Sequence, residues 1–405
     1  MKPNEGYPYL ENTKADIRLL GISPQVNPHA DKISAQRGMM YSTHLNQAQL
    51  SNGAEVPRNF SGQEAQVGRY SYNHVPRSEV VFPRVDIPKF VTNSGADYIT
   101  YNPTHYLITQ GQDTGEISYI KADTYTMRSD GYGYFNKVSP VQLGVPLDPN
   151  FDVTTSPAHD GPVYKMMGVN LKVAYMGMCQ VAEDAFVISE SAARKLQPEA
   201  FGKLEFDIDA DEIPLNLYGD DDNYKFMPDI NDVVNEDGIL CALRKPTADS
   251  IIRDTSEAAL AEVQPLHDKT FCAPAGARIV DIDIWINRKA KSKLPDGYKQ
   301  IVFAQAEKYR QQLVAMYKRI YDAYEQFKSE NSYGTKFSPT FCTLVRQAIG
   351  ELLCDGVRLP SIRPSKSGII PTQKKRPINF IHIEVTYNFP RKINLGFKLT
   401  GRQGN

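Results

Sequence analysis

Residues 170–196 read NLKVAYMGMCQVAEDAFVISESAARKL, a stretch with two short apolar runs on either side of a polar connection. Apolar residues alternate from Leu171 to Tyr175, and Ala185–Ile188 forms the second run, so each run favours a β-strand. Glu190–Lys195 then reads as the opening of a helix. This order predicts two strands joined by a polar loop and followed by a helix.

The polar loop, 177–184, ends in the adjacent carboxylates Glu183 and Asp184. Neighbouring side chains on a strand edge point to opposite faces, so these two are poorly arranged to act together as an acid and base pair. They can still serve Mg²⁺, one directly or through water and the other by organising the loop, because this ion keeps several of its waters. A solvated loop end is the other interpretation of the same pair.

A second candidate site is the basic stretch 391–405, RKINLGFKLTGRQGN. It contains Arg391, Lys392, Lys398 and Arg402, no acidic residue, and three glycines that let the backbone approach a ligand closely. Such a stretch is suited to binding phosphate, although a solvated basic tail has the same composition.

The formal net charge of −1 conceals a strong segregation of charge along the chain. Residues 205–237 contain twelve acids and one lysine, a net charge of −11, whereas residues 358–402 contain ten bases and one acid, a net charge of +9. The basic part includes Lys374, Lys375 and Arg376 within a proline-rich connector. We therefore expect one acidic face, one basic face, and nucleic acid bound at one place.

The 405 residues suffice for two or three domains, and 41% hydrophobic with 23% charged residues is ordinary for a globular protein. No stretch reaches the roughly 20 apolar residues of a membrane span, and the amino terminus lacks the apolar core of a signal peptide, so we expect a cytosolic protein. The five cysteines form no CxxC pair, which predicts neither a cysteine zinc site nor a disulfide framework. We expect them to be reduced and mostly buried.

One long helix is predicted at residues 299–328, where large apolar residues recur at spacings of four and three from Tyr309 to Phe327. This stripe favours ordinary helix packing, although a helical hairpin offered to a partner has the same pattern. A proline-rich basic connector, 360–377, separates the helix from the last predicted strands, around Phe380–Tyr387.

Three stretches, in this order along the chain, resemble the β subunit of multisubunit DNA-dependent RNA polymerases in the half that reaches the active centre. Residues 36–49, QRGMMYSTHLNQAQ, are similar without gaps to a family helix whose first arginine approaches the nascent RNA or the nucleoside triphosphate. Asn170–Leu196 is similar to the segment in which a VAFM-like strand leads to a Glu-Asp pair and to a strand ending in Ser-Glu-Arg. Residues 391–405 are similar to the loop with Arg-Arg-Ile, Gly-Asp-Lys and Gly-Arg-His-Gly-Asn-Lys-Gly.

The resemblance implies roles for the residues that match the catalytic motifs. Lys398 and Arg402 would neutralise phosphate charge that develops in the transition state. Glu183 and Asp184 would keep the triphosphate-bound Mg²⁺ in place. The catalytic Mg²⁺ itself would be held mainly by an aspartate triad on a β′-like partner subunit.

Other residues would bind nucleic acid or nucleotide if the resemblance holds. Arg37 falls on the arginine that approaches RNA or the triphosphate, and Gln47 falls on a glutamine near the RNA. The further basic residues that we assign to this role are Lys374, Lys375, Arg376, Arg391 and Lys392.

The fold expected from the resemblance is α+β, with an incomplete double-psi β-barrel, a β-rich lobe and a flap-like module that carries the long helix 299–328. The expected parts are an N-terminal segment with the RNA-side helix at 1–60, the β-rich lobe at 61–165 and the first barrel portion at 166–200. The flap-like module follows at 201–345, and a basic connector with the second barrel portion at 346–405. Unpaired barrel edges predict further β-like chains, which supply the N-terminal half and the continuation after Asn405. DNA template, RNA and nucleoside triphosphates are the other expected partners, and no membrane is expected.

The chain departs from the family pattern at three positions. Pro390 stands where the family usually has a second active-site lysine, Phe397 replaces an acid, and Gln403 replaces a histidine. Such divergence around a retained lysine and arginine resembles the split β-like subunits of giant bacteriophage RNA polymerases. This narrower resemblance implies activity in the host cell cytoplasm, with the virion as a second location.

Two rival interpretations remain open. Tyr218–Asp221 spell YGDD, the metal-binding turn of single-chain RNA-directed polymerases and reverse transcriptases. Pro214 just before this turn, and Asp222 and Asn223 after it, favour a solvated acidic turn instead. The other rival is a non-enzymatic virion or scaffold protein, which the many strand and loop segments would also suit.

Overall fold

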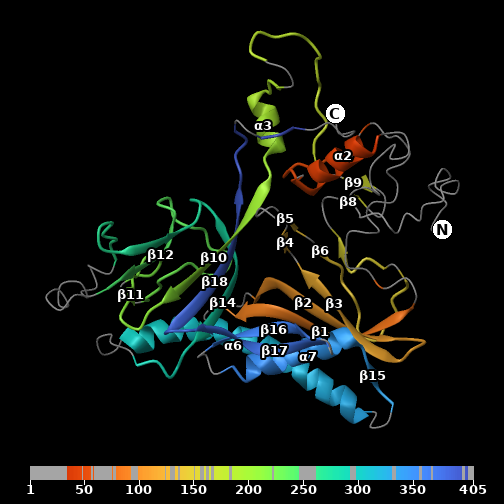
Figure 1. The fold of residues 1–405 in the computed structure, drawn as a ribbon, viewed down its shortest axis with the longest axis vertical. Coiled ribbons are helices and arrows are strands. Elements are labelled where there is room, and N and C mark those ends of the chain that lie inside the picture. The colour runs from red at the N-terminus through yellow and green to blue at the C-terminus, as the bar shows by residue number, and fades with distance from the viewer. Residues whose placement is uncertain are drawn as a thin grey trace.

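A three-stranded antiparallel sheet in the order β10-β18-β14 connects the main parts of the computed structural model (Figure 1). Its strands are β10 (Glu199–Ile208), β18 (Ile381–Pro390) and β14 (Arg278–Ile286). Successive side chains of a strand point to opposite faces of the sheet. One face is apolar, with Phe206, Ile383 and Ile284 side by side across the three strands, and the other face is charged.

The structure describes residues 34–47, 49–55, 58, 75, 79–92, 99–123, 125–127, 133–135, 137–149, 151–155, 159–160, 164–165, 168–181, 185–220, 223–245, 261–291, 298–330, 334–354, 358–365, 368–394 and 397–399. Over these residues it is a mixed α+β structure with several sheets, as expected, and their strands form no closed barrel. The predicted part boundaries stay predictions, although strands of the expected flap-like module and of the second barrel portion share the central sheet.

The other described elements form one four-stranded sheet, β1-β2-β3-β15, one three-stranded sheet, β11-β12-β13, four two-stranded sheets and four helices. The strands are β1 (Val81–Thr92), β2 (Ile99–Gly111), β3 (Glu116–Asp123), β4 (Tyr125–Met127), β5 (Gly133–Phe135), β6 (Lys137–Val138), β7 (Thr154–Thr155), β8 (His159–Asp160), β9 (Tyr164–Lys165), β11 (Ile213–Pro214), β12 (Ile239–Arg244), β13 (Lys269–Cys272), β15 (Lys336–Phe337), β16 (Arg358–Ser365) and β17 (Gly368–Pro377). The described helices are α2 (Ala35–Gln47), α3 (Glu190–Leu196), α6 (Tyr298–Glu330) and α7 (Pro339–Leu352).

Helix α6 contributes to both of the largest apolar cores. Val302 and Tyr309 pack under the apolar face of the central sheet, whereas Leu313 and Ile320 pack with α7 and with strands β1 to β3. The long helix predicted at 299–328 is therefore confirmed, and its apolar stripe serves ordinary packing. None of the described helices has the length and apolar character needed to cross a membrane.

Serine residues begin two of the helices. The hydroxyl of Ser189 accepts a hydrogen bond from the backbone N–H of Ala192 at 3.2 Å and caps α3, so the predicted helix after the 185–188 run is confirmed. Ser338 caps α7 in the same way through Phe341, at 3.1 Å.

A buried lysine joins the β1-β2-β3-β15 sheet to the central sheet. Lys89 of β1 is only 2% exposed, and its Nζ lies 2.9 Å from Asp281 and 2.7 Å from Asp283 of β14. Burial opposes the lysine charge, but the two carboxylates outweigh it and hold the pKa of Lys89 well above its usual value. The two sheets are thus held together by paired charges as well as by apolar packing.

The strands predicted at Leu171–Tyr175 and Ala185–Ile188 are wrong. Both runs are mostly exposed, and neither belongs to a strand in the part of the chain that the structure describes. Alternating apolar side chains favour a strand, but a strand also needs a neighbour for its backbone groups. The described part of the chain provides no such neighbour here.

The proline-rich connector, 360–377, contains paired strands. β16 and β17 form an antiparallel hairpin with pairing up to Ser365 and Gly368. Each strand of a two-stranded sheet is an edge strand, where proline is tolerated because one side of the strand needs no ladder hydrogen bonds. The proline content therefore concealed the hairpin.

The cysteines are less buried than predicted. All five are free, but only Cys241 is buried, while Cys179 and Cys272 are exposed. Cys179 lies in the exposed run that follows Gly168, and Cys272 ends an edge strand of the small β11-β12-β13 sheet. The small, apolar side chain of cysteine therefore did not predict burial at Cys179 and Cys272.

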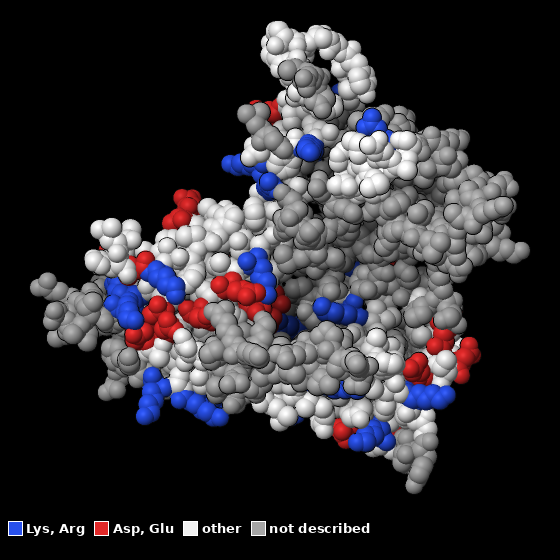
Figure 2. All heavy atoms as spheres, viewed as in Figure 1, with Lys and Arg blue, Asp and Glu red and all other residues white. Residues whose placement is uncertain are grey.

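The acidic stretch 205–237 does not form an uninterrupted acidic face. Lys225 contacts Asp229 and Asp232 at 3.2 and 2.6 Å, and Lys308 of α6 also contacts Asp229, at 3.2 Å. Figure 2 shows basic and acidic side chains interleaved over β11 and β12. The expectation of one acidic face is wrong on this side, because Lys225 of the stretch itself and Lys308 from α6 pack against these acids.

Candidate functional site

The residues that directly follow the stretches 36–49 and 170–196 meet the first residue of the stretch 391–405 at Gln197 and Pro198. The backbone N–H of Asn52, just after α2, donates a hydrogen bond to the carbonyl oxygen of Gln197 at 3.0 Å, and Ser51 forms a β-bridge with Pro198. The N–H of Arg391 donates to the carbonyl oxygen of Pro198 at 2.9 Å. Ends of all three stretches therefore come together near α2 and α3, at one end of the molecule (Figure 1). We call this contact the Pro198 junction.

The pairing of β10 with β18 creates the Pro198 junction. Glu199 is paired with Pro390, so the chain that leaves α3 and the chain that enters the basic stretch run side by side. Within the same pair, Gly202 lies opposite Tyr387, and a Cβ at Gly202 would lie 2.4 Å from an atom of the tyrosine ring. Glycine at this position lets the ring lie across the strand.

The residues after α2 also hold the start of the 170–196 stretch. The backbone N–H and side-chain Nδ2 of Asn170 donate to the carboxylate of Glu55, at 3.1 and 3.0 Å. The N–H of Arg58 in turn donates to Oδ1 of Asn170, at 3.1 Å. The hydrogen bond from the Asn170 side chain lowers the pKa of Glu55. Both ends of the stretch are thus anchored by the same short segment.

Arg37 lies in the first turn of α2 and is exposed. Its backbone N–H donates to the hydroxyl of Ser34, at 3.3 Å, which helps to begin the helix that the resemblance of residues 36–49 implies. Gln47 is the last residue of α2. The helix is confirmed, whereas the RNA or nucleotide contacts of these two residues stay predictions.

Glu183, Asp184 and Arg402, to which we assigned catalytic roles, lie outside the described residues. The chain on both sides of the carboxylate pair is exposed, including Tyr175 at 96% and Phe186 at 57%. The structure therefore leaves the Mg²⁺ prediction untested.

The basic stretch begins with an aromatic contact. The guanidinium of Arg391 lies over the ring of Phe397, 4.9 Å from its centroid, and the N–H of Phe397 donates to the carbonyl oxygen of Asn394 at 3.3 Å. Phe397 is one of the departures from the family pattern, and it gives Arg391 a role in shaping the loop. Lys392 and Lys398 are exposed, as a phosphate-binding role requires.

The other predicted basic residues, Lys374, Lys375 and Arg376, lie on β17. This strand packs against α7. Figure 1 shows β17 near α6 and α7, away from α2 and α3. The structure therefore does not bring these three residues to the Pro198 junction.

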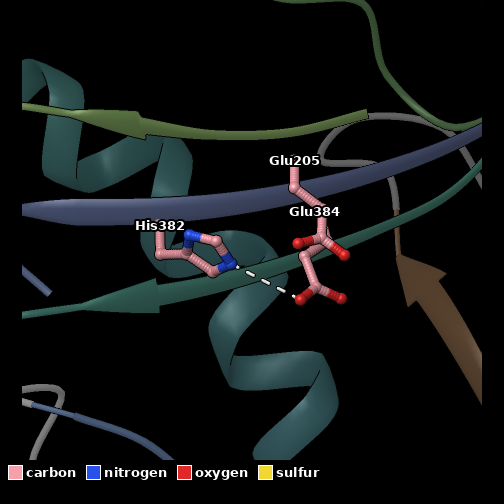
Figure 3. A group of neighbouring side chains, drawn as sticks. All are labelled: Glu205, His382 and Glu384. Carbon is pink, nitrogen blue, oxygen red and sulfur yellow. Dashed lines mark hydrogen bonds and ion pairs between the residues drawn. The ribbon is translucent and has the colours of Figure 1, made fainter. Parts of the chain in front are cut away.

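A group of side chains on the charged face of the central sheet was not predicted as a site. Glu205, His382 and Glu384 offer ligand atoms that all lie within 4.8 Å of one another (Figure 3). The signal in the sequence is the spacing of two in Glu205-x-Asp207 and His382-x-Glu384, which puts each pair on one face of a strand. Which strands pair with each other is not visible in that spacing.

The electrostatics of this group are dominated by the carboxylates. Burial opposes ionisation of Glu384, but hydrogen bonds from His382 and Lys203 outweigh it and lower the pKa of Glu384 to about 2. Burial also opposes the imidazolium, but hydrogen bonds with Glu384 and Asp207 outweigh it and raise the pKa of His382. Positive charge is therefore favoured at this place.

The described residues of the YGDD sequence, 218–220, belong to a hydrogen-bonded turn. The N–H of Tyr218 donates to the carbonyl oxygen of Lys225 at 2.9 Å, and the carboxylate of Asp220 accepts from the N–H of Asn223 at 2.7 Å. Asp220 is exposed. A Cβ at Gly219 would lie 2.0 Å from the carbonyl oxygen of Asn223, so the turn requires glycine. Asp220 thus has a local role in the turn, in line with the prediction of a solvated acidic turn.

Comparison with known proteins provides no family. A scan of the sequence against protein-family models finds no match, and a search of the curated proteins finds no relative. The polymerase resemblance stays a prediction that rests on the three stretches named above.

Proposed function

We propose that this chain is a β-like subunit of a multisubunit DNA-dependent RNA polymerase. In this role it helps to bind the incoming nucleoside triphosphate, the second Mg²⁺, and RNA or template near the active centre. The Pro198 junction carries the proposal, because it brings together the adjoining ends of three stretches that are far apart in the sequence. Each of these stretches resembles a different part of the same active-centre half. Chance resemblance gives no reason for them to share one junction.

Lys398, an exposed lysine of the basic stretch, suits the proposed chemistry. In nucleotidyl transfer the 3′-hydroxyl of RNA attacks the α-phosphorus and pyrophosphate leaves, so negative charge develops on the phosphate oxygens. Lys398 and Arg402 would stabilise that charge from the β side, and Arg37 and Gln47 would contact RNA or nucleotide. Glu183 and Asp184 would support the second Mg²⁺, which supplies further charge neutralisation. The chain before these two carboxylates is anchored by the hydrogen bond of Asn170 with Glu55, and the chain after them by the hydrogen bond of Asn52 with Gln197.

The exposed apolar run after Gly168 supports a role within an assembly. Tyr175, Met176 and Val173 are 96%, 68% and 61% exposed, and a contiguous apolar surface of this kind is typical of an interaction site. We propose that strands of partner chains pair with this run and complete a double-psi β-barrel. The partners are a β′-like subunit with an aspartate triad and further β-like chains, working on DNA in the host cell cytoplasm.

Isolation of the native complex tests this function. The chain is tagged in its native source, and mass spectrometry identifies the chains that purify with it. We expect a β′-like chain with an aspartate triad, and RNA synthesis by the complex from a DNA template, nucleoside triphosphates and Mg²⁺. The isolated chain should make no RNA. Purification without such a partner would favour a virion or scaffold protein and overturn the proposal.

A pair of substitutions separates the proposal from the YGDD rival. Asp220→Asn should leave RNA synthesis by the complex unchanged, because the carboxylate of Asp220 stabilises its local turn. Asp184→Ala should reduce synthesis. Loss of synthesis in the first variant together with full activity in the second would support an RNA-directed polymerase instead.

A further inference from the structure

The charged face of the central sheet places two rows of polar side chains across its strands. Glu205 of β10 lies directly opposite Glu384 of β18, and Asp207 lies directly opposite His382. Directly paired residues of adjacent strands point to the same face. Figure 3 shows the imidazole of His382 and the carboxylates of Glu205 and Glu384 directed toward one another. The group therefore follows from the strand register.

The contacts of His382 orient its ring toward the two glutamates. The ring is buried, with a relative exposure of 1%, and its Nδ1 lies 2.6 Å from the carboxylate of Asp207. This short contact assigns a ring proton to Nδ1, which donates to Asp207. The Nε2 atom then faces Glu384. Metal-binding histidines in proteins are held in this way, with the second ring nitrogen donating to a carboxylate.

The spacing of the His382 and Glu384 atoms is also that of two ligands of one ion. Nε2 lies 3.4 Å from Oε1 of Glu384, a long hydrogen bond compared with the roughly 2.7–3.2 Å of ordinary N–H···O bonds. Two ligands at about 2.0–2.1 Å from a tetrahedral Zn²⁺ lie about 3.4 Å apart. The third ligand atom, from Glu205, lies within 4.8 Å of the other two, so a small side-chain movement completes the set.

The charge of this face also favours a cation. The face carries the carboxylates of Glu205, Asp207, Asp281, Asp283 and Glu384, and Lys89 and Lys203 contact four of them in the part of the chain that the structure describes. Lys89 binds the two aspartates of β14, and Lys203 lies 2.8 Å from both Glu205 and Glu384. The side chain of Lys203 is 41% exposed, so it can turn into solvent when another cation takes its place.

We propose that Nε2 of His382 and the carboxylates of Glu384 and Glu205 form a Zn²⁺ site, in which Lys203 holds the place of the ion until it binds. Asp207 positions the imidazole, and water completes the coordination. One imidazole with two carboxylates is a ligand set that Zn²⁺ accepts. The ion links β10 to β18 in the middle of the strand pair that leads to the Pro198 junction. The site is independent of the proposed polymerase function.

Zinc titration of the purified full-length chain, without a histidine tag, tests this site. After chelator treatment, calorimetry measures the affinity for Zn²⁺ and for Mg²⁺, and a thermal melt measures the shift in Tm. We expect one Zn²⁺ per chain, a rise in Tm, and much weaker binding of Mg²⁺. Absence of saturable Zn²⁺ binding, or equal binding of both ions, would overturn the proposal.

Substitutions identify the ligands and the competing lysine. His382→Gln and Glu384→Gln should each weaken Zn²⁺ binding at least about tenfold, and Asp207→Asn should weaken it roughly 10- to 100-fold. His105→Gln, which removes another histidine paired with an aspartate, is the matched control and should bind as the unmodified chain does. Unchanged affinity in His382→Gln, or equal loss in His105→Gln, contradicts the site.

Lys203→Met provides a test that does not depend on removing a buried group. It should bind Zn²⁺ more tightly than the unmodified chain, because it removes the cation that competes with the ion. If Lys203 were only a structural partner of the two glutamates, Lys203→Met would bind Zn²⁺ as tightly as the unmodified chain or more weakly. That result would overturn the proposed replacement of Lys203 by the ion, and it can be obtained even if the histidine variant fails to fold.

Discussion

The backbone N–H of Arg391 donates a hydrogen bond to the carbonyl oxygen of Pro198 across 2.9 Å. The contact extends the β10–β18 ladder past its last paired residues, Glu199 and Pro390. Through it, the basic stretch begins beside the end of the stretch that carries the Glu-Asp pair.

Removal of this hydrogen bond should lower the stability of the chain. Arg391→Pro lacks the N–H donor, whereas Arg391→Ala keeps it and loses only the side chain. We expect Arg391→Pro to be about 1 kcal/mol less stable than Arg391→Ala, the typical contribution of one backbone hydrogen bond. Urea unfolding of both variants measures the difference, and equal midpoints would show that the bond contributes nothing.

Substitution of Lys398, an exposed lysine of the basic stretch, should reduce catalysis in the assembled polymerase. Lys398→Ala removes a positive charge that stabilises the transition state, so we expect RNA synthesis to slow by about 10²- to 10³-fold. Single-nucleotide addition by the purified complex measures the rate. Lys318→Ala, at an exposed position of α6, is the matched control and should keep full activity. Similar rates in both variants would contradict the role of Lys398.

Substitution of the buried lysine between two sheets should strongly destabilise the fold. Lys89→Met leaves Asp281 and Asp283 partly buried without their cation, and breaking such a group typically lowers the free energy of unfolding by about 3 kcal/mol or more. The partial exposure of Asp283, 28%, favours the lower end of that range. Lys318→Met should change stability little. A loss below about 1 kcal/mol would mean that water replaces the lysine easily.

Alkaline pH should destabilise the chain through Tyr218. Burial raises the pKa of this tyrosine to about 12, and its hydroxyl donates to the carbonyl oxygen of Ile239 at 2.6 Å. Between pH 10 and pH 12 the unfolded chain releases a proton that the folded chain keeps, so rising pH favours unfolding in this window.

Tyr218→Phe removes this contribution and should show a shallower fall in stability between pH 10 and pH 12. Urea unfolding at several pH values measures the slope, and Tyr175→Phe, at a position that is 96% exposed, should keep the slope of the unmodified chain. Identical slopes for the Tyr218→Phe variant and the unmodified chain would contradict the assignment.

Much of the local structure could be predicted because it depends on neighbours in the sequence. Helix α6 shows its apolar period over many turns, and α3 and α2 lie where short-range signals place them. The runs at 171–175 and 185–188 show the limit of that approach, because their alternation is visible but their pairing depends on another strand. The hairpin of β16 and β17 was not predicted, because its prolines argue against strands. The two strands form a sheet of their own, in which both are edge strands and tolerate proline.

The candidate sites divide in the same way. Lys392 and Lys398 could be selected from the sequence, because basic residues in a glycine-rich setting are suited to phosphate, whereas Arg37 was selected through the family resemblance. The His382 group could not be selected, because its members come from strands whose partnership is a long-range choice.

The sequence by itself therefore determined the long helix, the helix starts and the alternation of strand faces, since these follow from backbone geometry and short-range side-chain spacing. Only the tertiary structure decided that β18 lies between β10 and β14. That order brings Arg391 to Pro198 and His382 to Glu205. Strand pairing depends on burying one apolar face of the sheet against a shared core, and no signal within a single strand specifies it.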